Sequence, residues 1–242
     1  MTDRPRVLAV LLLLACVALP AAAREKRTHF RGAFDGKQML RMTLIRDGDR
    51  ITGVYLYEAV GEPIRVEGTA QGNDVRLSQI GEGGQRTGQF LGSWRGKIFS
   101  GNWTGADTGA PALPFSFDAD AAPDDGTSGR YEAFTGRLTN RLNVLLLPGQ
   151  RLRFRLSAYW VPEGSDPSFA NTGVVAGTMR MTGDTAIYEA EGCRIAFNFS
   201  GRNVRVEQAA AGPACGMGSN VDGSGLYRQT DSEVDIAALE GF

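Results

Sequence analysis

Histidine and lysine are nearly absent from this chain of 242 residues. The single histidine is His29, and the lysines are Lys26, Lys37 and Lys97. Catalysis of the Ser-His-Asp or Cys-His type needs a histidine base held by packed neighbours, and we expect His29 to lie near a mobile chain end. Ser-Lys catalysis lacks its S-x-x-K spacing. The sequence therefore predicts no catalytic residue for nucleophilic hydrolysis.

A pair of catalytic carboxylates is not indicated either. Glycoside hydrolysis needs two carboxyl groups at a set separation in a cleft, one of them with a raised pKa. The acidic candidates are Glu58, Glu62, Glu67 and Glu82. Because Glu58 and Glu62 flank turns and Glu67 alternates with apolar neighbours, we expect surface carboxylates. An enzyme would be the better hypothesis if Glu58 or Glu62 were buried opposite a second carboxylate.

Metal and phosphate sites lack their usual motifs. Four aspartates gather at Asp118, Asp120, Asp124 and Asp125. They miss the spacing and the closing glutamate of a calcium loop. No Lys-Ser/Thr pair follows the glycines of residues 81–84, so that segment is not a phosphate-binding loop. We expect neither a metal site nor a cofactor.

The charge balance and the hydropathy exclude two kinds of partner. The formal net charge is −1, which argues against binding to nucleic acid or to an anionic membrane surface. No long apolar run occurs after residue 23, so we expect no membrane-spanning helix. The 32 glycines, together with β-branched and aromatic residues, favour many short strands joined by turns.

Residues 1–23 have the pattern of a secretory signal peptide. Arg4 and Arg6 precede a short apolar run, which ends at small residues before Arg24. The run is too short to be interpreted as a membrane-spanning helix. We expect cleavage after Ala23 and a periplasmic or secreted mature protein. Residues 13–16 loosely resemble a bacterial lipobox, so a lipid anchor at Cys16 is the alternative.

Cysteine is scarce, with three in the chain. Cys16 is removed or lipidated, which leaves Cys193 and Cys215. Two cysteines in an exported protein usually pair. A metal or redox pair is disfavoured because the spacing is not C-x-x-C and His29 is far away in sequence. We predict a Cys193–Cys215 disulfide, which stabilises by roughly 3 kcal/mol in the chain-entropy model.

Residues 29–118 predict a series of short strands. In residues 39–44 and 63–67, apolar and polar side chains alternate, which is the pattern of a sheet with one buried face. Asn and Gly between the runs suit hairpin turns. The expected strands are residues 29–34, 38–45, 50–58, 63–70, 74–80, 86–94, 98–105 and 112–118.

A glycine followed two positions later by an aromatic residue recurs in this half. The pairs are Gly32 with Phe34, Gly53 with Tyr55, Gly88 with Phe90, and Gly101 with Trp103. Both members of a pair point to the same side of a strand, and a large ring can then fill the space beside a residue that has no side chain. This repeat favours an up-and-down meander barrel.

The strand pattern resumes after a polar segment. Residues 119–129 are rich in Ala, Asp, Gly, Pro and Ser, so we expect a linker or a long loop with nothing usefully buried. In residues 151–160, alternate side chains from Leu152 to Trp160 are expected to face inward. The expected strands are residues 130–138, 143–147, 151–160, 173–182, 185–190, 193–200, 203–209 and 224–229.

The predicted fold class is all-β, with two antiparallel up-and-down barrels or sandwich-like domains in tandem. The second domain covers residues 130–230 and holds the disulfide, which would fix the loop around Cys215 over one end of the sheet. Residues 231–242 are acidic with scattered apolar residues. We expect a frayed tail or a short helix there, not a binding element.

Residues 170–228 resemble a β domain of uncharacterised exported bacterial proteins. The matching positions are Asn171-Thr172-Gly173, Cys193-x-Ile195-x-Phe197-x-Phe199 and Cys215-Gly216-x-Gly218-x-Asn220-Val221. In some proteins this domain accompanies segments that are lysozyme-inhibitor-like. The resemblance implies an antiparallel β domain with one disulfide and no established catalytic residues. The first half is similar, more loosely, to avidin-like and lipocalin-like barrels, whose ligand-binding residues have no matching positions here.

Binding is the function class that remains. We expect an exported, non-enzymatic protein that acts at the cell envelope through protein or glycan contacts. Inhibition of a hydrolase of the lysozyme type is one specific version. The alternative is a carrier that holds a small apolar ligand inside a barrel, which a side-chain-filled interior would dismiss.

The best candidates for a contact surface are two loops in the second half, residues 162–171 and 212–222. Constrained loops lose less entropy on binding. The candidate contact residues are Trp160, Phe169, Asn171, Met217 and Asn220.

Overall fold

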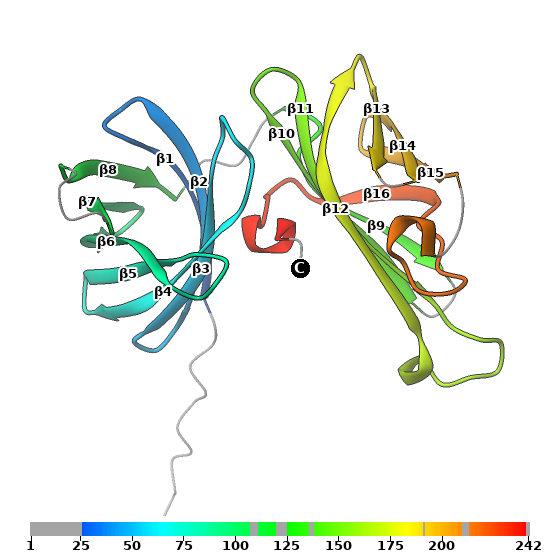
Figure 1. Ribbon diagram of the computed structural model, residues 1–242, viewed down its shortest axis with the longest axis horizontal. Helices are drawn as coiled ribbons and strands as arrows, with labels where there is room; N and C mark the ends of the chain where they lie inside the picture. Colours follow the sequence, from blue (N-terminus) through cyan, green and yellow to red (C-terminus); the bar gives the residue numbers. More distant parts are fainter. Residues whose placement is uncertain are drawn as a thin grey trace, which may run out of the picture.

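The computed structural model describes residues 26–106, 111–119, 125–135, 138–190, 192–209 and 213–240. These residues form two closed antiparallel β-barrels, one after the other along the chain (Figure 1). The predicted all-β tandem architecture is confirmed. The expected signal peptide and Cys16 lie outside the described residues. Within the described part of the chain, no helix has the length and apolar character needed to cross a membrane.

The first barrel is a meander in which each strand pairs with the next and β8 pairs with β1. Its strands are β1 (Lys26–Phe34), β2 (Gln38–Asp47), β3 (Arg50–Tyr57), β4 (Ile64–Gln71), β5 (Asp74–Ile80), β6 (Arg86–Arg95), β7 (Ile98–Gly105) and β8 (Leu113–Asp118). Every strand expected in residues 29–118 is present, with small shifts at the ends.

The second barrel has the same meander order, and β16 pairs with β9 to close it. Its strands are β9 (Gly129–Thr135), β10 (Leu138–Leu147), β11 (Arg151–Trp160), β12 (Asn171–Thr182), β13 (Thr185–Ala190), β14 (Cys193–Ser200), β15 (Asn203–Gln208) and β16 (Gly225–Asp231). The structure therefore shows a barrel where the sequence left a barrel or a sandwich open.

One strand starts earlier than the sequence predicted. We expected a strand at residues 143–147, but β10 begins at Leu138, and the preceding strand ends at Thr135. The first half of β10 is polar, and it includes an inward-facing residue, Asn140, which is fully buried. Its Oδ1 accepts a hydrogen bond from the backbone N–H of Tyr159 at 3.0 Å. A buried polar side chain with a backbone partner broke the apolar alternation on which the prediction relied.

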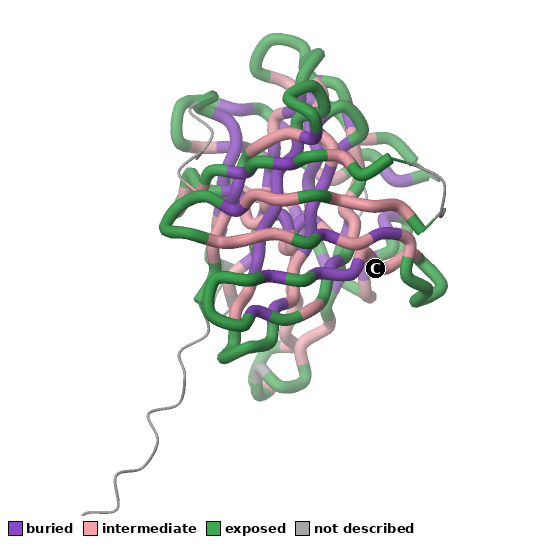
Figure 2. The backbone as a smooth tube through the Cα atoms, turned by 90° about the vertical axis from the view of Figure 1, so that its left-hand side faces the viewer, coloured by how far each residue is buried: buried purple, intermediate pink, exposed green. Residues whose placement is uncertain are grey.

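Side chains fill the interiors of both barrels. Along the strands, buried stretches alternate with exposed ones (Figure 2). In the first barrel the ring of Phe34 lies 5.7 Å from that of Phe90 and 5.5 Å from that of Trp103. In the second barrel the ring of Phe154 lies 5.0 Å from that of Phe197. Such aromatic pairs add about 0.5–1.5 kcal/mol each to the free energy of area burial.

Gly88 shows why glycine recurs beside aromatic rings. A Cβ at this position would come within 2.8 Å of the indole Nε1 of Trp103. The ring does fill the space beside a residue without a side chain, as predicted. It belongs to the neighbouring strand β7, however, and not to the residue two positions along the same strand.

The segment expected to be a linker includes buried residues in its described part, residues 125–129. Asp125 Oδ1 accepts hydrogen bonds from the backbone N–H groups of Thr127 and Ser128. Ser128 Oγ accepts a further one from the N–H of Leu146 at 2.8 Å. Both Thr127 and Ser128 are buried. The prediction that nothing in this segment is buried is wrong. Asp125 and Ser128 form a turn that packs against β10, because Ser128 Oγ accepts the backbone hydrogen bond of Leu146.

The outer faces of the two barrels pack against each other around the end of the chain. Residues 236–239 form a short 3-10 helix, η3 (Ile236–Leu239), which lies between the barrels (Figure 1). Its apolar side chains join one cluster with residues of β3 and β10. The members are Val54, Leu56, Leu145, Leu147, Val234, Ile236 and Leu239. The segment is therefore the short helix of the two alternatives, and its described part is not frayed.

The disulfide closes a gap in the second barrel. Strands β12 and β13 pair only at Met181 and Thr182. Near the start of β12, Met217 makes a bridge with Gly173, and the N–H of Gly218 donates to the carbonyl of Thr172. Cys215 of the same segment is bonded to Cys193 at the start of β14, with the two Cα atoms 4.5 Å apart. The predicted disulfide is confirmed.

Candidate functional site

Two polar clefts lie where the barrels meet, at the two ends of η3. The first, which we call the Glu82 cleft, has a volume of about 620 Å³. Its charged lining residues are Glu62, Arg65, Glu82, Arg153 and Glu240. The second, which we call the Arg155 cleft, has a volume of about 650 Å³ and is lined by residues of β1, β9, β10, β11 and the C-terminal segment. Both volumes suit a small ligand or part of a larger one.

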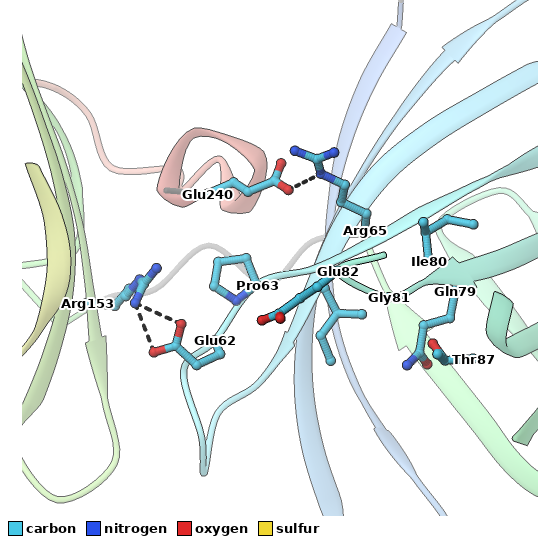
Figure 3. A pocket seen from close by; sticks show the side chains of 11 residues that line it. Glu62, Pro63, Arg65, Gln79, Ile80, Gly81, Glu82, Thr87, Arg153 and Glu240 are labelled. Carbon is cyan, nitrogen blue, oxygen red and sulfur yellow. Dashed lines mark hydrogen bonds and ion pairs between the residues drawn. The ribbon is translucent and has the colours of Figure 1, made fainter. Parts of the chain in front are cut away.

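The walls of the Glu82 cleft come from both barrels. On the side of the second barrel, Arg153 Nη1 donates to both carboxylate oxygens of Glu62, at 2.9 and 3.0 Å. Arg153 Nη2 donates to the carbonyl of Leu239 at 3.4 Å. On the side of the first barrel, Arg65 forms an ion pair with Glu240 (Figure 3). These pairs fix the walls of the cleft.

Glu82 is the carboxylate in this cleft that has no ionic partner among the residues that the structure describes. It follows β5 and is exposed, and its side chain points into the space between the barrels (Figure 3). The lining holds three glutamates and two arginines. Since each arginine already contacts one glutamate, Glu82 leaves the cleft with a free acceptor group.

Arg153 is buried although it faces away from the interior of its own barrel. The sequence placed it on the outer face of its strand, and it does face outward, but only 8% of its side chain is exposed. The first barrel covers it. The outer faces of β3 and β10 are partly buried because the other barrel covers them. The alternation of apolar and polar residues along a strand does not reveal this contact between the barrels.

Glu58 is not the surface carboxylate that the sequence predicted. It is 4% exposed, with its Oε1 2.9 Å from Arg31 Nε and 3.0 Å from Arg41 Nε. Burial lowers the pKa of Arg41, and the charge of Glu58 opposes that shift. Glu58 thus faces two guanidinium groups and not a second carboxylate. A glycosidase would have been favoured by a buried glutamate opposite a second carboxylate. Glu58 is buried, but no carboxylate lies opposite it among these contacts.

The turn after Glu58 is held by the second barrel. Arg151 Nη2 donates to the carbonyls of Glu58 and Ala59, both at 2.7 Å. Arg151 Nη1 donates to the carbonyl of Val60 at 2.9 Å. Hydrogen bonds from a charged donor are the strong ones. One side chain therefore fixes the β3–β4 turn of the first barrel against the second.

His29 lies within β1 and not in a mobile chain end. Its Nδ1 is 2.9 Å from Thr43 Oγ1, and its Nε2 is 3.7 Å from Glu233 Oε2. The expectation of mobility is wrong because β1 starts at Lys26 and pairs with β2 along its whole length. Among the described residues no group of three or more His, Cys, Asp or Glu side chains could hold a metal ion.

The two loops of the second barrel that were expected to form a contact surface, residues 162–171 and 212–222, touch each other. Asn171 Nδ2 donates to the carbonyl of Ser219 at 3.0 Å. Phe169 is 71% exposed and Asn220 is exposed as well, while Trp160 is half-buried against the core. Met217 is 3% exposed and packs against Gly173. Met217 is therefore not available as a contact residue, because its side chain is packed against β12.

Comparisons of the chain with family models, curated protein sequences and solved structures find no match. The resemblance of residues 170–228 to an exported bacterial β domain stays a prediction. Function is therefore argued from the geometry of the clefts and loops.

Proposed function

We propose that this protein is an exported, non-enzymatic binding protein of the cell envelope, and that it binds a glycan in the Glu82 cleft. The observation that supports this most is the lining of that cleft. Carboxylate acceptors and guanidinium donors from two barrels face each other within about 620 Å³. A sugar hydroxyl both donates and accepts hydrogen bonds, so neighbouring hydroxyls match such a mixed lining.

Glu82 is the first contact that we assign to the glycan. It is exposed, points into the cleft and has no ionic partner in the described part of the chain. A carboxylate accepts hydrogen bonds only, and hydrogen bonds to charged groups contribute about 1.5–3 kcal/mol. We expect Glu82 to accept from one or two hydroxyl groups. Arg65 and Glu240 supply a donor and an acceptor across the cleft.

The carrier alternative has little support. The core of the first barrel is occupied by packed rings, with the centroid of Phe99 4.8 Å from that of Phe115 and the centroid of Phe34 5.5 Å from that of Trp103. The core of the second barrel is a continuous cluster of buried side chains. A carrier needs a large apolar interior cavity, and the polar clefts lie between the barrels.

Export is supported by the disulfide, since disulfides persist in oxidising compartments. The mass of the mature protein isolated from a secreting host tests this part of the proposal. A chain that starts at Arg24 supports cleavage after Ala23. A chain that starts at Cys16 with an added lipid supports the anchored alternative, and a chain that keeps residues 1–23 contradicts export.

The glycan proposal is tested with a glycan array followed by calorimetric titration of the best ligand. We expect Glu82→Gln to weaken binding about tenfold, because one charged acceptor is lost. Glu207→Gln, an exposed glutamate on the outer face of β15, is the matched control and should leave binding unchanged. Absence of glycan binding, or equal binding by the two variants, contradicts the proposal.

A protein partner is the second candidate, and the exposure of Phe169 favours it. This ring lies at the end of a 3-10 turn, Pro167–Phe169, in a loop fixed to the disulfide segment. Exposed aromatic side chains on constrained loops are frequent anchors in protein interfaces. If the partner is a lysozyme-type hydrolase, excess protein should inhibit cell-wall lysis, and Phe169→Ser should relieve the inhibition. Unchanged lysozyme activity would remove this version.

A further inference from the structure

The Arg155 cleft contains a second kind of binding chemistry. Four arginines and four carboxylates line it. Each carboxylate has a basic partner within the cleft. The pairs are Asp235 with Arg27, Asp231 with Arg130, Glu132 with Arg130 and Arg141, and Glu233 with His29. Three of the four carboxylates are therefore engaged by arginines, whereas Glu233 has, among the described residues, only the imidazole of His29, 3.7 Å away.

Arg155 is the arginine of this cleft whose side chain has no carboxylate partner and no hydrogen bond among the described residues. It is half-buried on the outer face of β11. Its cross-strand neighbours are Asn143 on β10 and Ala176 on β12. Neither neighbour carries a negative charge, so nothing on the adjacent strands neutralises the guanidinium group. An arginine always keeps its charge, and this one offers a planar donor to the cleft.

Three of the residues that line the cleft next to Arg155 on β10 and β11 are polar and uncharged. Ser157 and Tyr159 follow it on the same face of β11, and Asn143 lies opposite. A serine hydroxyl and an asparagine amide can both donate and accept hydrogen bonds. The tyrosine ring adds a flat apolar surface with a polar end. This combination suits a sugar ring better than an acidic peptide, because it contains partners for hydroxyl groups as well as a surface for the ring.

We propose that the Arg155 cleft binds the carboxylate of an acidic sugar. Arg155 forms the charged, two-point contact with the carboxylate, Asn143 and Ser157 bind hydroxyl groups, and Tyr159 lies against the ring. The proposal deepens the glycan-binding function, on which it rests, and assigns a charged ligand to a different cleft. No residue of the Glu82 cleft takes part in it.

Calorimetric titration with a trimer of galacturonic acid and with its methyl ester tests the proposal. The ester lacks the charge of the carboxylates and carries one additional methyl group on each carboxyl group. We expect the acid to bind at least about tenfold more tightly than the ester, since a charged hydrogen-bonded contact is lost in the ester. The difference should shrink as salt is added, because screening weakens an accessible ion pair.

Two variants locate the contact. Arg155→Gln should remove the preference for the acid, and so should Ala176→Glu, which places a carboxylate beside Arg155 on the neighbouring strand. The matched control is Arg205→Gln, an exposed arginine on the outer face of β15. It should bind like the wild type, and Glu82→Gln should keep the preference for the acid.

Several results would overturn the inference. They are equal binding of acid and ester, a preference for the acid that survives Arg155→Gln, and a preference for an acidic tetrapeptide over the trimer. If neutral glycans still bind and depend on Glu82, the proposed function stands and only this inference fails. If no sugar binds at either cleft, both fail together.

Discussion

Arg41 and Arg153 face outward from their strands, Glu58 follows directly after β3, and all three are nevertheless buried. Alternation along a strand tells which side chains point into its own barrel, and in this respect the sequence was a good guide. It contains no information on which part of the outer face a second domain covers. The charged residues of the interface were therefore predicted as solvent-facing, and their burial follows only from the packing of the barrels.

Replacement of Glu58 by glutamine should be strongly destabilising. The change removes the charge that faces Arg31 and Arg41, and it leaves the buried guanidinium of Arg41 without its counter-ion. Loss of one partner of a buried ion pair costs about 3–5 kcal/mol. Denaturant unfolding of Glu58→Gln measures this loss. Glu67→Gln, an exposed glutamate on β4, should change the free energy of unfolding by less than about 0.5 kcal/mol.

Tyr131 should make the protein sensitive to alkali. Burial raises the pKa of its phenol to about 12, whereas the phenol in the unfolded chain titrates near its ordinary value of about 10. The unfolded state therefore loses its proton first as the pH rises. The stabilising contribution is complete below about pH 10 and is lost progressively up to about pH 12.

Unfolding experiments between pH 8 and pH 12 check this prediction. The Tyr131 contribution amounts to at most about 2.7 kcal/mol for a shift of this size. Tyr131→Phe should be slightly less stable at neutral pH, because the hydrogen bond from its hydroxyl to the carbonyl of Thr127 is lost. Its stability should then fall less steeply with pH than that of the wild type. Parallel curves for the two proteins would contradict the assignment.

At the scale of the element, strands were predicted well and irregular segments poorly. Alternate apolar residues such as Ile195, Phe197 and Phe199 define β14 and its register without ambiguity. Asn140 hid the start of β10, and the C-terminal helix η3 has too few residues to show a periodic pattern. The clefts could not be predicted, since they bring together residues such as Arg65 and Glu240 from distant parts of the chain.

The disulfide should stabilise the whole molecule and, in addition, protect the segment around Cys215 in the second barrel locally. It closes a loop with a sequence separation of 22 residues, for which the chain-entropy model gives about 3 kcal/mol. The double variant Cys193→Ala/Cys215→Ala should lose about this amount. Hydrogen exchange should become faster at Gly218, whose N–H donates to the carbonyl of Thr172, by more than it does in β1–β8. An increase at Gly218 no larger than that in β1–β8 would contradict a local role.

At the scale of the whole molecule, the two barrels form one unit through a mixed interface. Its centre is the apolar cluster of β3, β10 and η3. Its border is charged, with Arg151 on the β3–β4 turn and Arg153 on Glu62. Both clefts depend on this arrangement, because each has walls from both barrels. The orientation of the barrels thus determines the shape of both proposed binding sites.

A variant that disrupts this interface should separate the barrels without unfolding them. We expect this of Leu147→Asp combined with Arg151→Ala, because a buried charge in the apolar cluster is costly and three contacts to backbone carbonyls are lost. Small-angle scattering should show a larger radius of gyration, and calorimetry should show two transitions in place of one. Arg205→Ala is the control. An unchanged radius would contradict the role of the interface.

The arginines that line the clefts from within strands are outward-facing, whereas the inward-facing side chains at alternate positions hold each barrel closed. Selection for folding and selection for ligand choice therefore act on different positions of the same strands. In homologous sequences, positions such as Leu152, Phe154 and Leu156 should stay constant. Arg155 and its outward-facing neighbours should vary together with the ligand, so that one scaffold can evolve many specificities.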